Sequence, residues 1–126
     1  MHLRVLLCGM EGVGKTAVMT AYVEGTPFVS EYMPTLGVDM KIKRLGRNTK
    51  VRFWDTSGDK RFNAVTRTYF SDTDIVIFFY DATCLESLYY IEDCYRDLLQ
   101  SRFLDISTAV VATKIDQGRS VPMHMV

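Results

Sequence analysis

Gly9-Met10-Glu11-Gly12-Val13-Gly14-Lys15-Thr16 is the stretch of sequence that decides the fold. It has a glycine, four further residues and then Gly-Lys-Thr, the pattern of a phosphate-binding loop. Glycines let such a backbone curl until successive N–H groups converge on phosphate oxygens, and the helix that follows adds its positive N-terminal end. We expect the loop to cradle phosphates, Lys15 to reach the β- and γ-phosphates, and the Thr16 hydroxyl to bind Mg²⁺. The alternative is a plain glycine-rich turn. The predicted phosphate-contacting residues are Gly9, Glu11, Gly12, Val13, Gly14, Lys15 and Thr16.

Two predicted elements flank this loop. Residues 3–8 (LRVLLC) form a short, mostly apolar run, typical of a strand buried on both faces of a parallel sheet. Residues 15–23 predict a helix, because apolar side chains recur there at helical spacing. Those side chains are Ala17, Val18, Ala21 and Tyr22. A strand, a glycine loop and a helix in this order is the context that a phosphate-binding loop requires.

The rest of the chain continues to alternate strands and helices. Residues 38–45 and 51–54 alternate apolar and polar side chains and predict a hairpin. Residues 74–80 (DIVIFFY) and 109–112 (AVVA) are apolar runs that predict buried strands. Between them, Thr83-x-x-Glu86 is a capping box that predicts the start of a helix. Its apolar stripe is predicted to consist of Leu88, Ile91, Tyr95 and Leu98.

This order of elements predicts the fold class. Strand, helix, hairpin, strand, helix and strand indicate an α/β domain with right-handed crossovers and helices on both faces of the sheet. We expect a mostly parallel, twisted sheet with one antiparallel edge strand. The 126 residues fit a single domain, residues 1–126, without repeats, low-complexity segments or an internal boundary.

Composition narrows the classes of function. The 15 basic and 15 acidic residues balance, so no overall field favours nucleic acid or an anionic membrane. No apolar run approaches the ~20 residues of a membrane span. Residue 2 is His2 and the C-terminus lacks a lipidated cysteine box, so we expect no membrane anchor within this chain. Cys8, Cys84 and Cys94 match neither a disulfide framework nor a zinc site, which indicates buried thiols in a reducing cytoplasm.

Two short motifs follow later strands. Asp55-Thr56-Ser57-Gly58 ends a strand, where the Asp55 carboxylate can hold Mg²⁺ through water and the Gly58 N–H can approach a γ-phosphate; an Asp-Gly turn is the alternative. Thr113-Lys114-Ile115-Asp116 follows the last strand. Asp116 can accept two N–H donors from one edge of guanine, where adenine offers no matching pair; a solvated loop is the alternative. All these motifs follow predicted parallel strands, at the edge where open α/β sheets bind ligands.

Taken together, the motifs resemble the Ras superfamily of small GTPases, most closely its Rab-like members. The stretches that carry the resemblance, over essentially the whole chain, are GMEGVGKT, YMPTLGVD, FWDTSGDKRF, YDATCLES and TKID. The resemblance implies a P-loop NTPase fold, GTP or GDP and Mg²⁺ as cofactors, and a role in signal transduction and vesicle trafficking. Family members continue with an edge strand, a base-contacting loop and a closing helix, so we expect a partial G domain that lacks the final strand and helix.

The resemblance also assigns residues outside the phosphate-binding loop. Thr35 matches the switch threonine that closes on Mg²⁺ and the γ-phosphate, which makes Thr16, Thr35 and Asp55 the predicted metal ligands. Asp55 and Gly58 match the second switch. Phe28 matches an aromatic residue that packs against guanine, with a loop anchor as the alternative.

Lys114 and Asp116 match the family's base-reading pair. Thr113 precedes them at a position where many members have asparagine, although Rho-like members also have threonine there.

Two residues depart from the family pattern near the expected γ-phosphate. Asp59 stands where the family usually has the glutamine that orients the attacking water. Like-charge repulsion from this carboxylate indicates slow hydrolysis, with Asp59, Thr35 and Gly58 as the expected catalytic group. Glu11 stands where the family tends to have a small residue. Its side chain could crowd a partner's arginine finger or place a second negative charge near the γ-phosphate; the alternative is a solvated side chain that points outward.

The leading hypothesis is therefore a GTP/GDP switch with slow, Mg²⁺-dependent hydrolysis. Its expected partners are effectors, exchange factors and activating proteins, bound through the segments around Thr35 and Gly58, with residues 36–40 and Trp54 facing effectors. Ordinary core packing is the alternative for Trp54. We expect the protein in the cytoplasm or, through partners, at the cytosolic face of membranes. A non-catalytic nucleotide-binding or protein-interaction module is the main alternative, and a P-loop ATPase or nucleotide kinase is a third.

Overall fold

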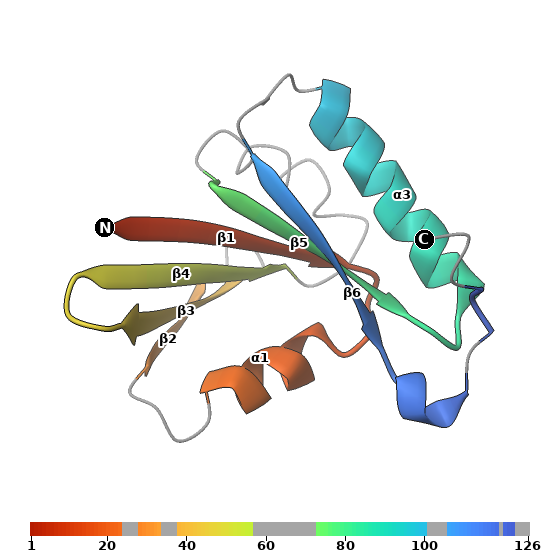
Figure 1. Cartoon of the computed structure of the whole chain (residues 1–126), viewed down its shortest axis with the longest axis horizontal. Helices are drawn as coiled ribbons and strands as arrows, with labels where there is room; N and C mark the ends of the chain where they lie inside the picture. Colours follow the sequence, from red (N-terminus) through yellow and green to blue (C-terminus); the bar gives the residue numbers. More distant parts are fainter. Residues whose placement is uncertain (24–27, 34–37, 57–72, 101–105, 119, 123–126) are drawn as a thin grey trace.

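The structure is a computed structural model that describes residues 1–23, 28–33, 38–56, 73–100, 106–118 and 120–122. The described elements run along the chain as a strand, a helix, four strands, a second helix, a strand and a short 3-10 helix (Figure 1). Neither described α-helix combines the length and the apolarity that crossing a bilayer requires. In chain order the elements are β1 (His2–Gly9), α1 (Lys15–Val23), β2 (Phe28–Met33), β3 (Val38–Leu45), β4 (Thr49–Thr56), β5 (Ile75–Asp81), α3 (Leu85–Gln100), β6 (Ser107–Thr113) and the short 3-10 helix η3 (Ile115–Gln117).

The described strands form one mixed sheet in the order β2-β3-β4-β1-β5-β6. The strands β4, β1, β5 and β6 pair in parallel, which confirms the predicted α/β class and the mostly parallel sheet. The hairpin of β3 and β4 is antiparallel, as predicted, and Gly46 in its turn has a φ of 70°. However, β3 is not the edge strand, because β2 pairs antiparallel along its outer side. The sequence analysis did not predict β2.

Helices cover both faces of the sheet, as the packing on the two sides of β1 shows. Leu6 and Cys8 belong to the buried cluster that includes Leu88 and Ile91 of α3. The alternate residues Val5 and Leu7 belong to a second cluster, which includes an α1 side chain. A strand with both faces covered must be apolar throughout, and the predicted burial of residues 3–8 is confirmed for Val5 to Cys8. The cyan α3 and the orange α1 lie on opposite sides of β1 in Figure 1.

The two helices meet the sheet differently. The helix α1 spans Lys15–Val23, as predicted. Among its described apolar side chains, Met19 is buried, whereas Ala17, Val18, Ala21 and Tyr22 are exposed. The exposed Tyr22 lies edge-on to Phe53 of β4, with ring centroids 5.8 Å apart.

The stripe predicted for α3 is largely confirmed. Leu88, Ile91 and Leu98 are buried, and Tyr95 packs edge-on against Phe78 although it is 42% exposed. The three cysteines are free thiols, of which Cys8 is buried and Cys84 and Cys94 are partly buried. Burial raises the pKa of the Cys8 thiol far above its ordinary value.

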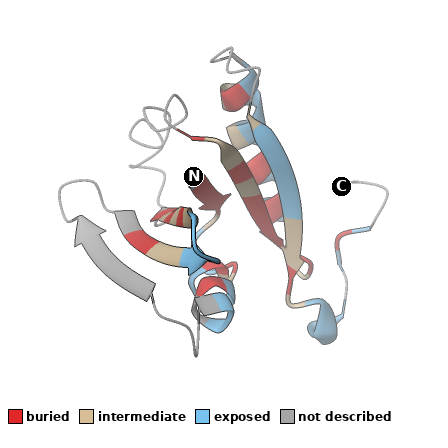
Figure 2. Cartoon of the chain, turned by 60° about the vertical axis from the view of Figure 1, so that its left-hand side comes forward, coloured by how far each residue is buried: buried red, intermediate tan, exposed pale blue. Residues whose placement is uncertain are grey.

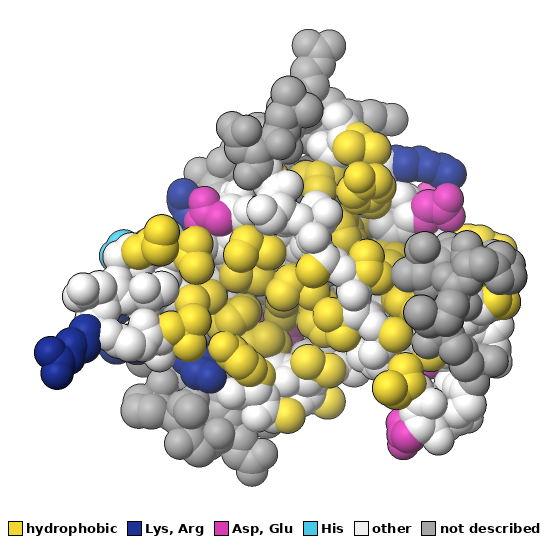
Figure 3. Space-filling model, viewed as in Figure 1, with side chains coloured by type: hydrophobic (Ala, Val, Ile, Leu, Met, Phe, Trp, Pro, Cys, Tyr) yellow, Lys and Arg dark blue, Asp and Glu magenta, His cyan; other side chains and the backbone are white. Residues whose placement is uncertain are grey.

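The strand β6 is less buried than its apolar sequence predicts. Ala109 and Val110 are exposed, because β6 is the outer strand of the described sheet (Figure 2). Apolar side chains also gather over the central strands on the face seen in Figure 3. An open apolar hollow beside α1 is lined by Leu3, Val5, Leu7, Val18, Met19, Tyr22, Leu45, Val51, Phe53, Ile75, Ile77, Phe79 and Val111.

Candidate functional site

The loop between β1 and α1 is shaped to hold an anion. Gly12 and Gly14 have φ angles of 83° and 99°, in the region that side-chain-bearing residues disfavour. Gly9 lies so close to β5 that an added Cβ would stand 2.8 Å from the carbonyl oxygen of Phe79. The helix α1 starts directly after the loop, and its Val18 N–H donates to the Gly14 carbonyl at 3.0 Å. The free N–H groups of its first turn therefore adjoin the loop, which is the arrangement that binds phosphate groups.

A buried cation lies in this loop. Lys15 is only 5% exposed, and its Nζ donates to the Gly9 carbonyl at 2.7 Å. Burial lowers the pKa of the Lys15 ammonium, while the negative charge of Asp55 opposes that shift. Lysine is rarely buried unless an anion pairs with it. The charge of Lys15 is therefore suited to an anion held by the loop.

Two oxygen atoms that could coordinate a cation lie side by side near this ammonium. The Thr16 hydroxyl, at the start of α1, donates to Oδ2 of Asp55 at 2.9 Å. Asp55 lies in β4, buried, one strand away from the loop. A hydroxyl and a carboxylate are hard oxygen ligands, which suit Mg²⁺. Among the described residues, no group of three His, Cys, Asp or Glu side chains could hold a metal.

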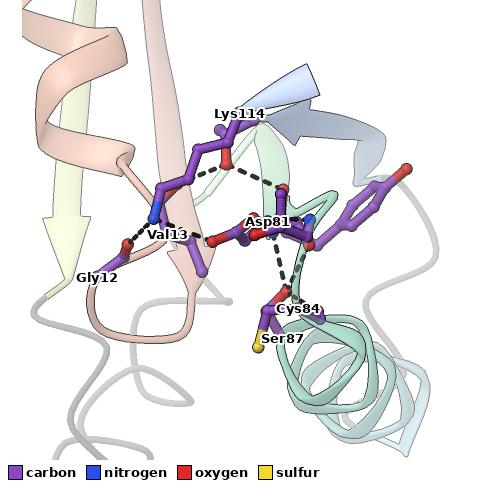
Figure 4. Close-up of polar contacts among 9 residues, drawn as sticks. Gly12, Val13, Asp81, Cys84, Ser87 and Lys114 are labelled. Carbon is purple, nitrogen blue, oxygen red and sulfur yellow. Dashed lines mark hydrogen bonds and ion pairs between the residues drawn. The ribbon is translucent and has the colours of Figure 1, made fainter. Parts of the chain in front are cut away.

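The segment after β6 docks against the phosphate-binding loop. The buried hydroxyl of Thr113 donates to the main-chain carbonyl of Val13 at 2.5 Å and lies 3.1 Å from that of Tyr80. Lys114 has a φ of 57°, and no other described non-glycine residue has a positive φ. Its Nζ donates to the Gly12 carbonyl at 3.0 Å (Figure 4). Asp116 then lies in η3 with its side chain exposed. The structure thus brings the two predicted motifs together.

One charged residue of this site was not predicted from the sequence. Asp81 ends β5, is buried, and accepts Lys114 Nζ at 2.9 Å (Figure 4). Burial raises the pKa of Asp81, but hydrogen bonds from Thr83 and Lys114 outweigh it, so the pKa lies below its ordinary value. The available signal was a carboxylate at the end of an apolar strand, the same position that Asp55 occupies.

The turn that contains Asp81 places the start of α3 later than predicted. The Thr83 hydroxyl donates to Oδ1 of Asp81 at 2.6 Å, and the helix begins at Leu85, one residue later than the capping box implies. Ser87 closes the turn by donating to the Cys84 carbonyl at 2.6 Å.

The structure describes only some of the remaining predicted residues. Glu11 is exposed, as the solvated alternative predicts. Trp54 is half-buried and packs against the cluster beneath α3, which favours the core-packing alternative. Phe28 is the first residue of β2, and the structure does not describe its side chain. Thr35, Gly58 and Asp59 lie outside the described residues.

Comparison with known proteins gives the same family throughout. The family model described as "Ras family" matches residues 4–125. Ras-related protein Rab-30 of Homo sapiens is 34% identical over 116 residues, which cover 90% of this chain and 57% of that protein. Ras-related protein RABC2b of Arabidopsis thaliana is 31% identical over 119 residues, with the same two coverages. GTP-binding protein yptV2 of Volvox carteri is 30% identical over 117 residues, covering 90% of this chain and 54% of that protein. The chain thus spans little more than half the length of these relatives.

Proposed function

Since the chain belongs to the Ras family and is Rab-like, we propose that it binds GDP and GTP with Mg²⁺ as a molecular switch. Residues 1–126 would lie within a single G domain. The observation that carries the proposal is the buried Lys15 ammonium in a loop whose Gly12 and Gly14 adopt positive φ angles. A nucleotide polyphosphate supplies the negative charge that this ammonium and the N-terminus of α1 favour.

The segment after β6 is proposed to select the base. The Asp116 carboxylate can accept two N–H donors from the edge of guanine, and adenine offers no matching pair. Thr113 and Lys114 both bond to carbonyls of the phosphate-binding loop, so the base-reading turn and the phosphate cradle hold one another in place. Phe28, at the start of β2, is proposed to pack against the base.

The metal ligands are proposed to be Thr16 and Asp55, whose oxygens lie 2.9 Å apart, together with Thr35. When bound, Mg²⁺ would offset the negative charge of the phosphates. The γ-phosphate would order the segments around Thr35 and Gly58, and its loss would release them. Effectors, exchange factors and activating proteins are the proposed partners at those segments.

Hydrolysis is proposed to be slow. Asp59 replaces the glutamine that orients the attacking water in the family, and its carboxylate would repel the γ-phosphate. Even in Ras itself the intrinsic rate is only on the order of 10⁻⁴ s⁻¹. Because the chain is Rab-like, we also propose a role in vesicle trafficking, in the cytoplasm or at the cytosolic face of membranes.

A second candidate function is a non-catalytic binding module. Glu11 lies exposed within the phosphate-binding loop, where its negative charge would disfavour a γ-phosphate and its side chain would crowd a partner's arginine. Single-turnover release of labelled phosphate from GTP separates the two functions. A first-order phase that disappears with EDTA supports the switch, whereas bound GTP that stays intact supports the module.

Nucleotide binding itself is tested by titrating a fluorescent GDP analogue with Mg²⁺ or with EDTA. We expect saturable binding that weakens in EDTA and that excess GTP, but not ATP, displaces. Displacement by ATP would instead favour the ATPase alternative. If the protein failed to bind the GDP analogue in Mg²⁺, its likeness to the family would reflect shared ancestry without shared activity.

A further inference from the structure

Asp81 is a buried charge to which the proposed nucleotide chemistry assigns no role. It is 7% exposed and is the last residue of β5, where it pairs with Thr113 of β6. Burying a carboxylate costs free energy unless cations and hydrogen bonds compensate it. The partners of this carboxylate therefore indicate what it does.

The two oxygens of Asp81 contact two different elements. Oδ1 accepts the main-chain N–H of Thr83 at 2.8 Å and its hydroxyl at 2.6 Å, in the turn that leads into α3. Oδ2 pairs with Lys114 Nζ at 2.9 Å. One carboxylate thus joins the start of α3 to the segment after β6.

Lys114 extends this connection to the phosphate-binding loop. Its Nζ also donates to the Gly12 carbonyl at 3.0 Å, so the ammonium lies between Asp81 and the loop (Figure 4). The Lys114 backbone is left-handed, with a φ of 57° and a ψ of 30°. Such a conformation costs a lysine free energy and persists only where its surroundings hold it. It also sets the direction of η3, in which Asp116 lies.

We propose that Asp81 is a positioning residue for guanine-nucleotide binding, which holds Lys114 against the Gly12 carbonyl and thereby docks the base-reading turn on the phosphate-binding loop. The inference rests on the proposed function, because it concerns the same site. Asparagine cannot replace this carboxylate. Its single oxygen can accept from Thr83 or from Lys114, but its NH₂ group then faces the other donor. Releasing Lys114 frees the turn that carries Asp116, so nucleotide dissociates faster.

The competing explanation is that Asp81 only caps α3. Ser87 provides the matched control, because it is buried in the same turn and contacts the main chain of Asp81 and Cys84 but not the carboxylate. If capping were the whole role, Ser87→Ala and Asp81→Asn would lower the unfolding temperature and change nucleotide release together. If Asp81 acts through Lys114, only Asp81→Asn accelerates release.

The experiment is a double-mutant cycle on the dissociation rate of a fluorescent GDP analogue in Mg²⁺, with unfolding temperatures recorded in parallel. We expect Asp81→Asn to accelerate release roughly 10-fold, the scale of one lost charge-assisted hydrogen bond. In a Lys114→Met background the same substitution should change release less than about 2-fold, because its partner is already gone. Ser87→Ala should leave the rate within about 2-fold of the parent.

Two outcomes would overturn the inference: an unchanged rate in Asp81→Asn, or the same acceleration with and without Lys114. If Asp81→Asn does not fold, Asp81→Glu retains the charge but displaces it by one methylene, and the same comparison between the two backgrounds applies. Failure of the proposed function is distinguishable, because the parent protein would then not bind the GDP analogue at all.

Discussion

Thr113 and Val13 lie 100 residues apart in the chain, yet the Thr113 hydroxyl donates to the Val13 carbonyl across 2.5 Å. The same hydroxyl lies 3.1 Å from the Tyr80 carbonyl. One buried hydroxyl therefore donates to the phosphate-binding loop and lies against β5, which links the expected base-reading segment to the expected phosphate cradle.

Removing this hydroxyl should destabilise the contact between the base-reading segment and the phosphate-binding loop. Thr113→Val keeps the shape of the side chain but removes the hydroxyl that donates to the Val13 carbonyl, and we expect a loss of about 1–3 kcal/mol in the free energy of unfolding. Nucleotide release should also accelerate. Thr113→Ser, which retains the hydroxyl, is the control. Urea unfolding and the dissociation of a fluorescent GDP analogue provide the readouts, and equal behaviour of the valine and serine variants would refute the role of the hydroxyl.

Lys15→Ala should abolish nucleotide retention, because the bound phosphates lose the buried cation beside them. Arg47→Ala is a suitable control, since Arg47 is an exposed cation in the turn between β3 and β4. Fluorescence titration with the GDP analogue compares the two. Retained affinity in the Lys15 variant would show that the phosphate-binding loop has been assigned wrongly.

Gly14→Ala tests the conformation of the loop. Gly14 has a φ of 99°, and the nearest atoms to an added Cβ, on Thr113, are 4.0 Å away, so the cost is conformational, about 1–2 kcal/mol. Gly46→Ala, at a φ of 70° in the hairpin turn, should cost a similar amount. Only the Gly14 variant should also weaken GDP binding. Equal affinities for the two variants would argue against a phosphate cradle at Gly14.

The Asp81–Lys114 pair should make stability depend on pH in acid. The pKa of Asp81 is below its ordinary value of 3.8 in the folded chain, so its contribution is complete above the unfolded pKa of about 3.9 and is lost as the pH falls through the folded pKa. Urea unfolding should therefore show a constant gap between the parent and Asp81→Asn from about pH 7 to pH 5, which narrows below about pH 4. Glu92→Gln, on the exposed face of α3, should show little difference at any pH. A gap for Asp81→Asn that persists unchanged in acid would contradict the ion pair.

Asp59→Gln should raise the rate of intrinsic GTP hydrolysis, if the family's arrangement of the attacking water is retained. Single-turnover phosphate release measures the change, and the Gln variant should still need Mg²⁺. An unaltered rate would mean that hydrolysis is limited by something other than residue 59.

The phosphate-binding loop and its flanking elements were predictable because their sequence signals are local. The glycine pattern of residues 9–16 sets the backbone, and continuous apolar runs mark strands with both faces buried. By contrast, the strand β2 has a mixed sequence, FVSEYM, and forms through pairing with β3 rather than through its own periodicity. The exposure of β6 depends on its place at the outer side of the described sheet, which its apolar sequence does not encode.

Part of the site was beyond prediction for a related reason. The sequence motifs pointed to Lys114, but the carboxylate that holds it comes from another strand. Asp81 and Lys114 meet only because β5 and β6 pair in register up to Thr113. Such a contact depends on sheet order and register, so it required the structure.

The most direct test of nucleotide binding is the nucleotide content of the protein purified in Mg²⁺ without added nucleotide. After denaturation, ion-exchange chromatography and mass spectrometry identify whatever the chain carried. We predict GDP or GTP in near-stoichiometric amounts from the parent and none from Lys15→Ala. A folded parent protein that carries no nucleotide and takes up neither GDP nor GTP would contradict the account.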